Sequence, residues 1–174
     1  QMAGVPEDMQ KRLEKVEGKV KVTLDYPDYF PFMEFAKDPE ARKALEAKFN
    51  LRGGQKNKDR LAEVLALRVE AAHLLGYKTH AHYVLEERMA QTPEAVTAFL
   101  DRIRKKLFEK GRPELQALIA LKREEEGPKS DGVLHAWDWR YYHEKLLRTK
   151  YQVDQEKIKE YFPMELVLEQ MLKV

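Results

Sequence analysis

The residues best suited to metal chemistry lie between positions 141 and 151, in the stretch YYHEKLLRTKY. His143 and Glu144 begin a near match to the HExxH motif, in which two histidines four residues apart on a helix bind one zinc ion. The glutamate of that motif acts as the base on the metal-bound water. Leu147 stands where the second histidine should be, and leucine cannot bind a metal. We therefore interpret His143, taken alone, as a hydrogen-bonded packing residue on a mostly apolar helix face.

The other histidines do not complete a set of metal ligands. His80 and His82 are two residues apart, so on a helix they point in different directions. His82 and Glu86, four apart, could hold one edge of a metal site, but a hydrolytic zinc site needs three protein ligands and an open position for water. His73, His80 and His135 would have to converge from separate elements. The sequence predicts no catalytic residue and no metal ligand in this chain, and it leaves the substrate-binding residues unknown.

Composition argues against several classes of protein. The 174 residues carry 32 Lys and Arg against 30 Asp and Glu, a net charge of +2, whereas nucleic-acid-binding domains usually have a concentrated basic excess. The absence of cysteine excludes disulfides and thiolate zinc sites, and it fits a reducing compartment. No apolar run approaches the roughly 18 residues of a membrane span, and the N-terminus does not resemble a signal peptide. We expect no nucleic-acid or membrane partner, and a cytoplasmic location with an organelle as the alternative.

Three further clusters have ordinary structural explanations. The basic residues between positions 102 and 112 have no aromatic residues interleaved on the same helix face and lie opposite an apolar stripe, which favours a solvated helix face over a nucleic-acid site. The segment Lys122–Glu126 is likewise predicted to be a solvated helix end. Four aromatic residues around position 140 could line a binding cleft, although aromatic residues at helical spacing are more typical of a core. These are Trp137, Trp139, Tyr141 and Tyr142.

Most of the chain is predicted to be helical. Apolar residues recur at helical spacing along most of the chain, so we predict an all-α array of about nine helices. At most one short strand is expected, near residues 19–25, where KVKVTLD alternates apolar and polar residues. Such a strand needs a partner, either in a weak hairpin or outside the chain.

Capping signals set most of the predicted helix boundaries. Asp138 is predicted to cap the helix over 139–150 by accepting a hydrogen bond from the backbone N–H of Arg140 or Tyr141. Gly111 should end one helix, and Pro113 should begin the next. The predicted helices span residues 29–36, 39–49, 58–75, 79–88, 93–111, 113–126, 139–150, 154–161 and 163–174, with Asp38, Thr79 and Thr92 as further N-caps and Gly76 as a C-cap, and residues 6–15 form a charged, weakly amphipathic run before them.

The helix over 58–75 is predicted to be the most deeply buried element. Its apolar residues form too wide a stripe for a one-sided surface helix, so we expect it to lie between two layers. Leu65→Ala is then expected to cost roughly 2–5 kcal/mol. The apolar residues are Leu61, Val64, Leu65, Leu67, Ala71, Ala72, Leu74 and Leu75.

The length and the ends of the chain suggest part of a longer protein. A chain of 174 residues is long enough to bury the core of one domain or to form part of a larger one. It begins at Gln1 rather than at a methionine, and it stops at Val174 within an apolar pattern that has no helix-stop signal. We expect residues 1–174 to be a single helical fragment of a larger protein.

Three long stretches follow one another in a family's order and spacing. They are YPDYFPFMEFAKDPEARKALEAKFN, LAEVLALRVEAAHLLGYKTHAHYVLEERMAQTPEAVTAFL and AWDWRYYHEKLLRTKYQVDQEKIKEYFP. Together they resemble the M3 family of zinc metallo-oligopeptidases over nearly the whole chain. The most specific pieces are LLGY followed by YVLE and MA, the WDWRYY block, and the VD…EYFP block.

The resemblance implies a parent enzyme that cuts short peptides in a deep channel between two mainly helical domains. In the M3 family the zinc-binding HEFGH helix, the third glutamate ligand and the assisting tyrosines follow the EYFP block, so His143 and Glu144 match the motif by coincidence. Residues 1–174 would form part of the channel wall, hold no cofactor, and be inactive alone, with zinc bound elsewhere in the parent enzyme. The expected partners are short peptides and the remainder of the peptidase.

The alternative is a free-standing helical binding or scaffold module without catalysis. The surface of the folded chain distinguishes the two hypotheses. An exposed apolar area of several hundred Å² would favour the peptidase fragment, because monomeric proteins rarely leave so large a patch uncovered. A sealed polar surface would favour the module.

Overall fold

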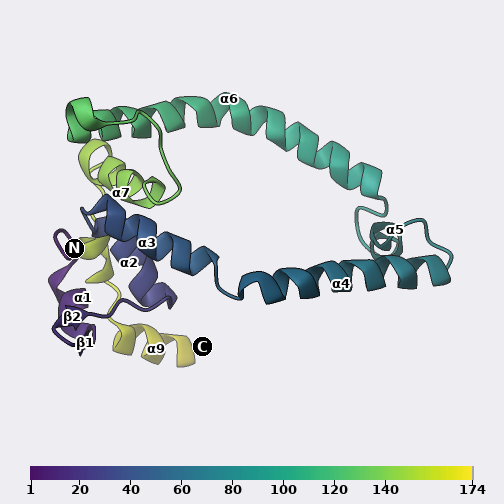
Figure 1. Ribbon diagram of the computed structural model, residues 1–174, viewed down its shortest axis with the longest axis horizontal. Helices are drawn as coiled ribbons and strands as arrows, with labels where there is room; N and C mark the ends of the chain where they lie inside the picture. The colour runs from purple at the N-terminus through teal and green to yellow at the C-terminus, as the bar shows by residue number, and fades with distance from the viewer. Residues whose placement is uncertain (174) are drawn as a thin grey trace. The chain divides into compact units, whose positions relative to one another are not determined.

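The computed structural model describes residues 1–173, which contain nine α-helices, one 3-10 turn and one β-hairpin. The all-α class is therefore confirmed. Contacts group the chain into two compact units, called here unit 1 (residues 1–46 and 118–174) and unit 2 (residues 47–117). The elements labelled in Figure 1 are α1 (Glu7–Arg12), β1 (Lys15–Val16), β2 (Lys19–Val20), α2 (Tyr26–Phe35), α3 (Pro39–Asn50), α4 (Gly54–Leu74), α5 (His80–Leu85), α6 (Pro93–Glu126), α7 (Trp139–Lys150) and α9 (Met164–Leu172), with the 3-10 turn η1 (Gly127–Lys129) and α8 (Gln155–Lys159) unlabelled.

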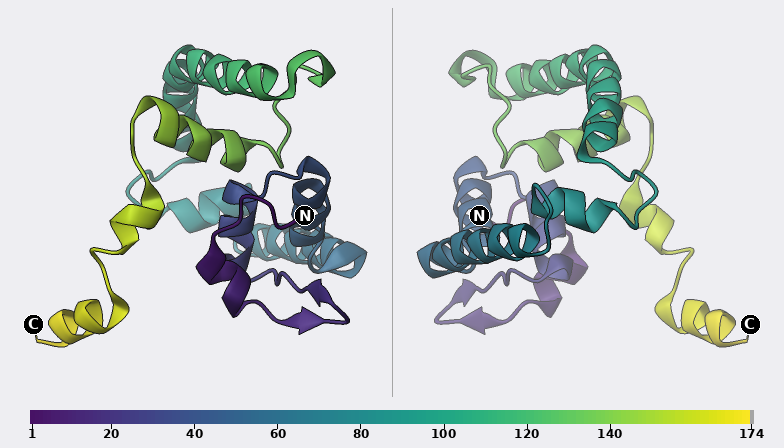
Figure 2. Two further views of the ribbon diagram at one scale, coloured as in Figure 1. Left: turned by 90° about the vertical axis from the view of Figure 1, so that its left-hand side faces the viewer. Right: turned by 90° about the vertical axis from the view of Figure 1, so that its right-hand side faces the viewer.

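The hairpin of unit 1 is shorter than the strand predicted over residues 19–25, and its two strands pair within the chain (Figure 2). Glu17 and Gly18 connect β1 to β2 with φ angles of 50° and 73°. Two consecutive residues with positive φ give the tight turn that suits the twist of an antiparallel pair. The register is Lys15↔Val20 and Val16↔Lys19.

Side-chain caps begin three helices where the sequence predicted them. Asp38 accepts hydrogen bonds from the backbone N–H groups of Glu40 (3.0 Å) and Ala41 (3.1 Å) at the start of α3. The hydroxyls of Thr79 and Thr92 do the same at the starts of α5 and α6. Each cap satisfies backbone donors that have no partner inside the helix.

Two helices are longer than predicted, and each contains a proline in its interior. Pro31 lies inside α2 and removes the N–H that would bond to the carbonyl of Pro27. The side chain of Arg12 donates to that carbonyl at 3.0 Å, which satisfies it. The predicted break at Gly111 and Pro113 is wrong, because α6 continues through both residues. Strong helix formers on either side of the pair outweigh its local preference.

The apolar core lies almost entirely in unit 1. Three aromatic side chains of α2 are buried, and α2 lies against α7. This packing buries one face of each helix, which is the main source of helix stability in a folded protein. The buried apolar residues of unit 1 are Val5, Met9, Leu13, Tyr29, Phe32, Met33, Phe35, Ala36, Leu45, Leu118, Tyr141 and Tyr142.

Unit 2 leaves many of its apolar side chains exposed. The prediction that the helix over 58–75, which corresponds to α4, is the most buried element is wrong. Ala72 is the one buried residue of α4, and Leu65 is 51% exposed. Within unit 2, α5 packs against α4, but it is too short to cover the wide apolar stripe. Within residues 1–173, no helix combines the length and apolarity needed to cross a bilayer.

Candidate functional site

The near-motif on α7 does not form a metal site. His143 is exposed and stacks on Trp139, with the ring centroids 5.2 Å apart, so the prediction of a packing histidine on an apolar face is wrong. Glu144 is buried instead, and it accepts a hydrogen bond from Nε of Arg148 at 2.8 Å. The apolar face of α7 therefore presents Glu144 rather than His143 to the core, and this glutamate already has a cation as its partner.

The remaining histidines have separate partners. In unit 2, Nδ1 of His82 lies 2.7 Å from the hydroxyl of Thr79, while Glu86 accepts a short hydrogen bond from Tyr77. Among residues 1–173, no three His, Asp or Glu side chains are close enough together to hold a metal ion. The residues present therefore do not fit the catalytic zinc ion that the family resemblance implies.

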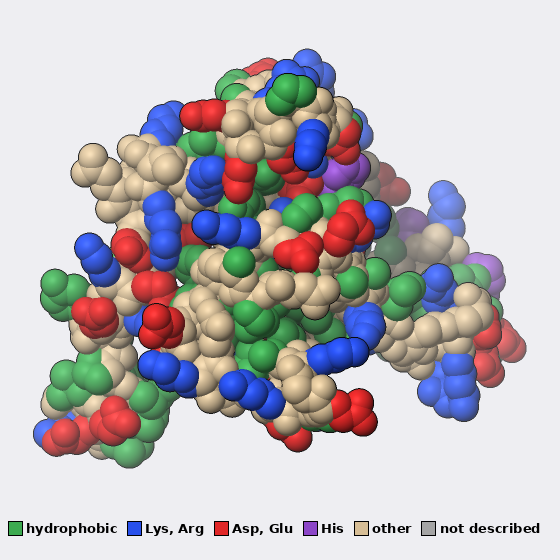
Figure 3. Space-filling view, turned by 60° about the vertical axis from the view of Figure 1, so that its left-hand side comes forward, with side chains coloured by type: hydrophobic (Ala, Val, Ile, Leu, Met, Phe, Trp, Pro, Cys, Tyr) green, Lys and Arg blue, Asp and Glu red, His purple; other side chains and the backbone are tan. Residues whose placement is uncertain are grey.

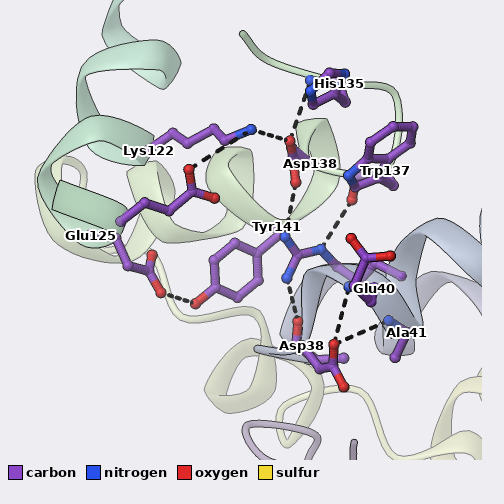
Figure 4. Close-up of polar contacts among 12 residues, drawn as sticks. Asp38, Glu40, Ala41, Lys122, Glu125, His135, Trp137, Asp138 and Tyr141 are labelled. Atoms are coloured by element: carbon purple, nitrogen blue, oxygen red, sulfur yellow. Dashed lines mark hydrogen bonds and ion pairs between the residues drawn. The ribbon is translucent and has the colours of Figure 1, made fainter. Parts of the chain in front are cut away.

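The most developed polar site in unit 1 is a buried ion network centred on Asp138 (Figure 4). Asp138 is fully buried, and its carboxylate accepts from Nη2 of Arg42 at 2.9 Å and from Nζ of Lys122 at 2.8 Å. The backbone N–H of His135 donates to the same carboxylate at 3.3 Å. Asp138 makes no side-chain hydrogen bond to the N-terminus of α7. The predicted capping role is wrong because the two buried cations occupy the carboxylate.

Arg42 joins α3 to the chain segment that leads into α7. It is 1% exposed, and its guanidinium also donates to the backbone carbonyls of Trp137 (3.0 Å) and Ala36 (2.7 Å). The guanidinium lies 4.3 Å from the ring centroid of Tyr141, at a distance typical of a cation–π contact. Arg42 thus uses its planar fork to bind one carboxylate and two carbonyls at once.

Lys122 fixes α6 to the same segment. The prediction that Lys122–Glu126 is a solvated helix end is wrong at Lys122, whose ammonium is buried and donates to the carbonyl of Val133 at 2.7 Å. Nζ of Lys122 also lies 3.1 Å from a carboxylate oxygen of Asp131. Burial acts to lower the pKa of Lys122, but hydrogen bonds to Asp138 and Asp131 outweigh burial and raise it above its usual value.

A second set of contacts extends the network along α7. The hydroxyl of Tyr141 donates to Glu125 at 2.7 Å, and Lys145 donates to the same glutamate at 2.7 Å. Burial and then the hydrogen bond to Glu125 raise the pKa of Tyr141. Burial also tends to raise the pKa of Glu125, but the hydrogen bonds from Lys145 and Tyr141 outweigh it and leave that pKa lowered. Tyr141 therefore stays protonated and serves as a hydrogen-bond donor.

Two cavities in unit 1 adjoin these residues. One, of about 510 Å³, is lined by residues that include Lys122, His135 and Trp137, and the last two stack with centroids 4.4 Å apart. The other, of about 310 Å³, is lined by residues that include Glu34 and Glu144. Burial, and then the charge of Glu144, raise the pKa of Glu34. None of the residues that line either cavity is a serine, threonine or cysteine.

The basic cluster of α6 is solvent-exposed, as the sequence predicted. The core interpretation of the aromatic cluster is confirmed only in part. Tyr141 and Tyr142 are buried, as a core interpretation requires, whereas Trp139 is 46% exposed. The basic residues of α6 between positions 102 and 112 are exposed. Acidic and basic side chains are interspersed over the face drawn in Figure 3, which is the pattern of an ordinary solvated surface.

Comparison with known proteins gives one consistent result. The model of the family described as "Peptidase family M3" matches residues 32–174. Saccharolysin from Saccharomyces cerevisiae is 38% identical, with all of this chain and 26% of saccharolysin aligned. The thimet-like oligopeptidase of Dictyostelium discoideum is 34% identical over 97% of this chain and 26% of its own length. Oligopeptidase A of Salmonella typhimurium is 32% identical over 94% of this chain and 25% of its own length. The chain spans about a quarter of the length of these relatives.

Proposed function

The chain belongs to peptidase family M3, and we propose that it is part of a zinc metallo-oligopeptidase that hydrolyses short peptides in a deep channel. Residues 1–174 contribute packed helices to the channel wall. Another part of the longer polypeptide binds the zinc ion that supplies the attacking water. The match over residues 32–174, together with relatives whose names identify them as oligopeptidases, supports this proposal most strongly.

The surface of unit 2 favours the peptidase segment over a free-standing scaffold module. Large apolar side chains are exposed along α4 and along the part of α6 that belongs to unit 2. A module that functions alone would bury such residues, because a large apolar side chain that passes from water to full burial contributes about 1.5–3 kcal/mol. The exposed residues are Leu61, Val64, Leu65, Leu67, Val69, Leu74, Leu75, Phe99, Leu100, Ile103, Leu107, Phe108 and Leu115.

The ion network of unit 1 fits the same role. Arg42, Lys122 and Asp138 connect α3, α6 and the start of α7 through buried, charge-assisted hydrogen bonds. Such bonds are directional and resist displacement. A channel wall needs this rigidity, since its shape must admit an extended peptide and exclude a folded protein.

The test is a substrate-length series with the longer polypeptide that contains residues 1–174. Quenched-fluorescence peptides of increasing length should be cleaved until the channel can no longer admit them, and a folded protein of suitable sequence should remain intact. Chelation of the zinc ion should stop cleavage, and added zinc should restore it. Cleavage of folded proteins at rates similar to those for short peptides would contradict the channel. A cytoplasmic location, with an organelle as the alternative, is part of the proposal and is testable by cell fractionation.

A further inference from the structure

A long apolar groove runs along α6 within unit 2. Its volume is about 790 Å³, and its apolar side chains are between 36% and 63% exposed. From position 100 to position 115 a helix rises about 22 Å, or roughly four turns. Side chains spaced by three and four residues along one helix face are the usual seat of a second amphipathic helix. The residues that form the groove are Leu100, Ile103, Leu107, Phe108, Gly111 and Leu115.

Gly111 is a second, independent sign of a partner at this groove. Glycine in a helix interior costs about 0.5–1 kcal/mol relative to alanine. At Gly111 the backbone is helical rather than left-handed, and a Cβ atom would meet nothing within 4 Å. No neighbour among residues 1–173 therefore requires glycine there. An element that packs closely on the floor of the groove would require glycine at this position, because a residue without a side chain permits a short distance between the two helix axes.

Charge at the rim indicates the chemistry of that partner. Residues 100–115 carry six basic and three acidic side chains, a net charge of +3. Arg104 is paired with Asp101 at 3.2 Å, whereas Arg112, which also lines the groove, has no ion pair among residues 1–173. A carboxylate opposite Arg112 would form a favourable pair at the edge of an apolar contact, and a second cation would be repelled.

We propose that the α6 groove binds an amphipathic helix with an acidic rim, contributed by a segment of the same peptidase polypeptide outside residues 1–174. The proposal rests on the proposed function, because that function requires a longer chain. The relatives are about four times as long as the aligned region, which leaves ample polypeptide to supply such a helix. Gly111 then lies at the closest approach of the two helices.

Thiol accessibility tests the proposal, since residues 1–174 contain no cysteine. Leu107→Cys places a reporter thiol in the groove. Glu109→Cys is the matched control, because it lies two residues from Leu107, on the side of the helix that faces away from the groove residues. Each variant is made in the 174-residue chain and in the longer polypeptide, with any cysteine of the added part replaced by serine. Far-UV circular dichroism verifies that each variant retains its helix content.

The expected result is a labelling rate at Leu107→Cys that falls on the order of tenfold or more in the longer polypeptide, while the rate at Glu109→Cys stays the same. Equal rates at Leu107→Cys in both proteins would overturn the proposal. Protection that arises in the 174-residue chain alone, and grows with its concentration, would also overturn it by identifying a second copy as the occupant. Peptidase activity of the longer polypeptide is measured separately, so an active enzyme with an unprotected groove contradicts this inference and not the proposed function.

Two synthetic peptides test the acidic rim. Both are 18-residue amphipathic helices with one apolar face, and they differ only in having glutamate or lysine along its borders. The glutamate peptide should protect the thiol of Leu107→Cys in the 174-residue chain at lower concentration than the lysine peptide. Arg112→Glu should reduce or reverse that preference, whereas Arg102→Glu, an equal change of charge outside the groove, should reduce it less. Equal protection by the two peptides would contradict the acidic rim.

Discussion

Asp138 is the residue on which the packing of unit 1 depends most directly. Its carboxylate is fully buried between Arg42 and Lys122, each of which is less than 5% exposed. Three ionic groups removed from water are stable only while each has its partners, because an uncompensated buried charge costs several kcal/mol. Removing the carboxylate would leave two cations facing one another in the interior.

We therefore predict that Asp138→Ala lowers the free energy of unfolding by about 3–5 kcal/mol. Asp138→Asn should cost nearly as much, because an amide keeps the shape but not the charge. Asp38→Ala, which removes a partly exposed helix cap, is the control and should cost about 1 kcal/mol. Urea unfolding followed by circular dichroism measures all three. A loss for Asp138→Ala no larger than that for Asp38→Ala would show that the network contributes little.

Ionisation of Glu34 is predicted to lower the stability of the folded chain, whereas ionisation of a salt-bridged acid raises it. Burial and the neighbouring charge of Glu144 raise its pKa, so the folded state binds this proton more tightly than the unfolded state. Ionised Glu34 therefore lowers stability above its folded pKa, and the effect disappears below the unfolded pKa of about 4.3. Glu34→Gln should raise the unfolding free energy at pH 7 and have a smaller effect near pH 4. An equal gain at both pH values would assign the effect to packing rather than to charge.

Sequence reasoning identified the outline of this site but not its connections. Asp138 stood out as a polar residue directly before a helix, and the capping interpretation followed from local rules. Its true partners are Arg42 and Lys122, which are 96 and 16 residues away along the chain. Lys122 belongs to the highly charged run KREEE, which looks solvated in isolation. No local pattern in a single sequence distinguishes a lysine that will be buried by a distant aspartate.

At the scale of elements, the sequence correctly predicted the helix starts that depend only on hydrogen bonds between residues close together in the chain. The caps at Asp38, Thr79 and Thr92 begin α3, α5 and α6 as predicted, because each bond forms within a few residues. Prediction failed at α4, whose wide apolar stripe indicated burial between layers. The stripe has the predicted width, but burial depends on other elements being present to cover it, and helical periodicity contains no information about them.

Two glycines of unit 2 provide a matched pair of element-scale predictions. A Cβ atom would meet nothing within 4 Å at either Gly76 or Gly111, but Gly76 has a φ of 84° and Gly111 is helical. Gly111→Ala should raise the helix content of the 174-residue chain and stabilise it by about 0.5–1 kcal/mol. Gly76→Ala should destabilise it by a similar or larger amount, because alanine is strained at that φ. Stabilisation by both, measured by thermal unfolding, would contradict the assigned conformations.

Leu65 tests whether α4 is exposed. In the 174-residue chain Leu65 is about half exposed, so Leu65→Ala should cost less than about 1 kcal/mol, as surface substitutions usually do. The same substitution in the longer polypeptide should cost roughly 2–5 kcal/mol if another segment covers the helix. Chemical denaturation of both proteins gives the comparison. A large loss in the 174-residue chain would show that α4 is already buried there.

At the scale of the whole molecule, the two units have different degrees of completeness. Unit 1 has an apolar core and a satisfied ion network, whereas unit 2 leaves most of its apolar side chains exposed. The chain aligns with about a quarter of the length of its relatives. Both observations fit a segment that provides structure to a larger peptidase and relies on other parts of it for cover and for chemistry.

The most direct test of this account compares the 174-residue chain with the longer polypeptide in one assay. Each protein is titrated with zinc, and each is then incubated with a quenched-fluorescence peptide in the presence and absence of a chelator. The longer polypeptide should bind one zinc ion tightly and cleave the peptide only without chelator. The 174-residue chain should do neither, because a hydrolytic site needs three protein ligands and an open water position. Stoichiometric zinc binding with chelator-sensitive cleavage by the 174-residue chain alone would contradict the account.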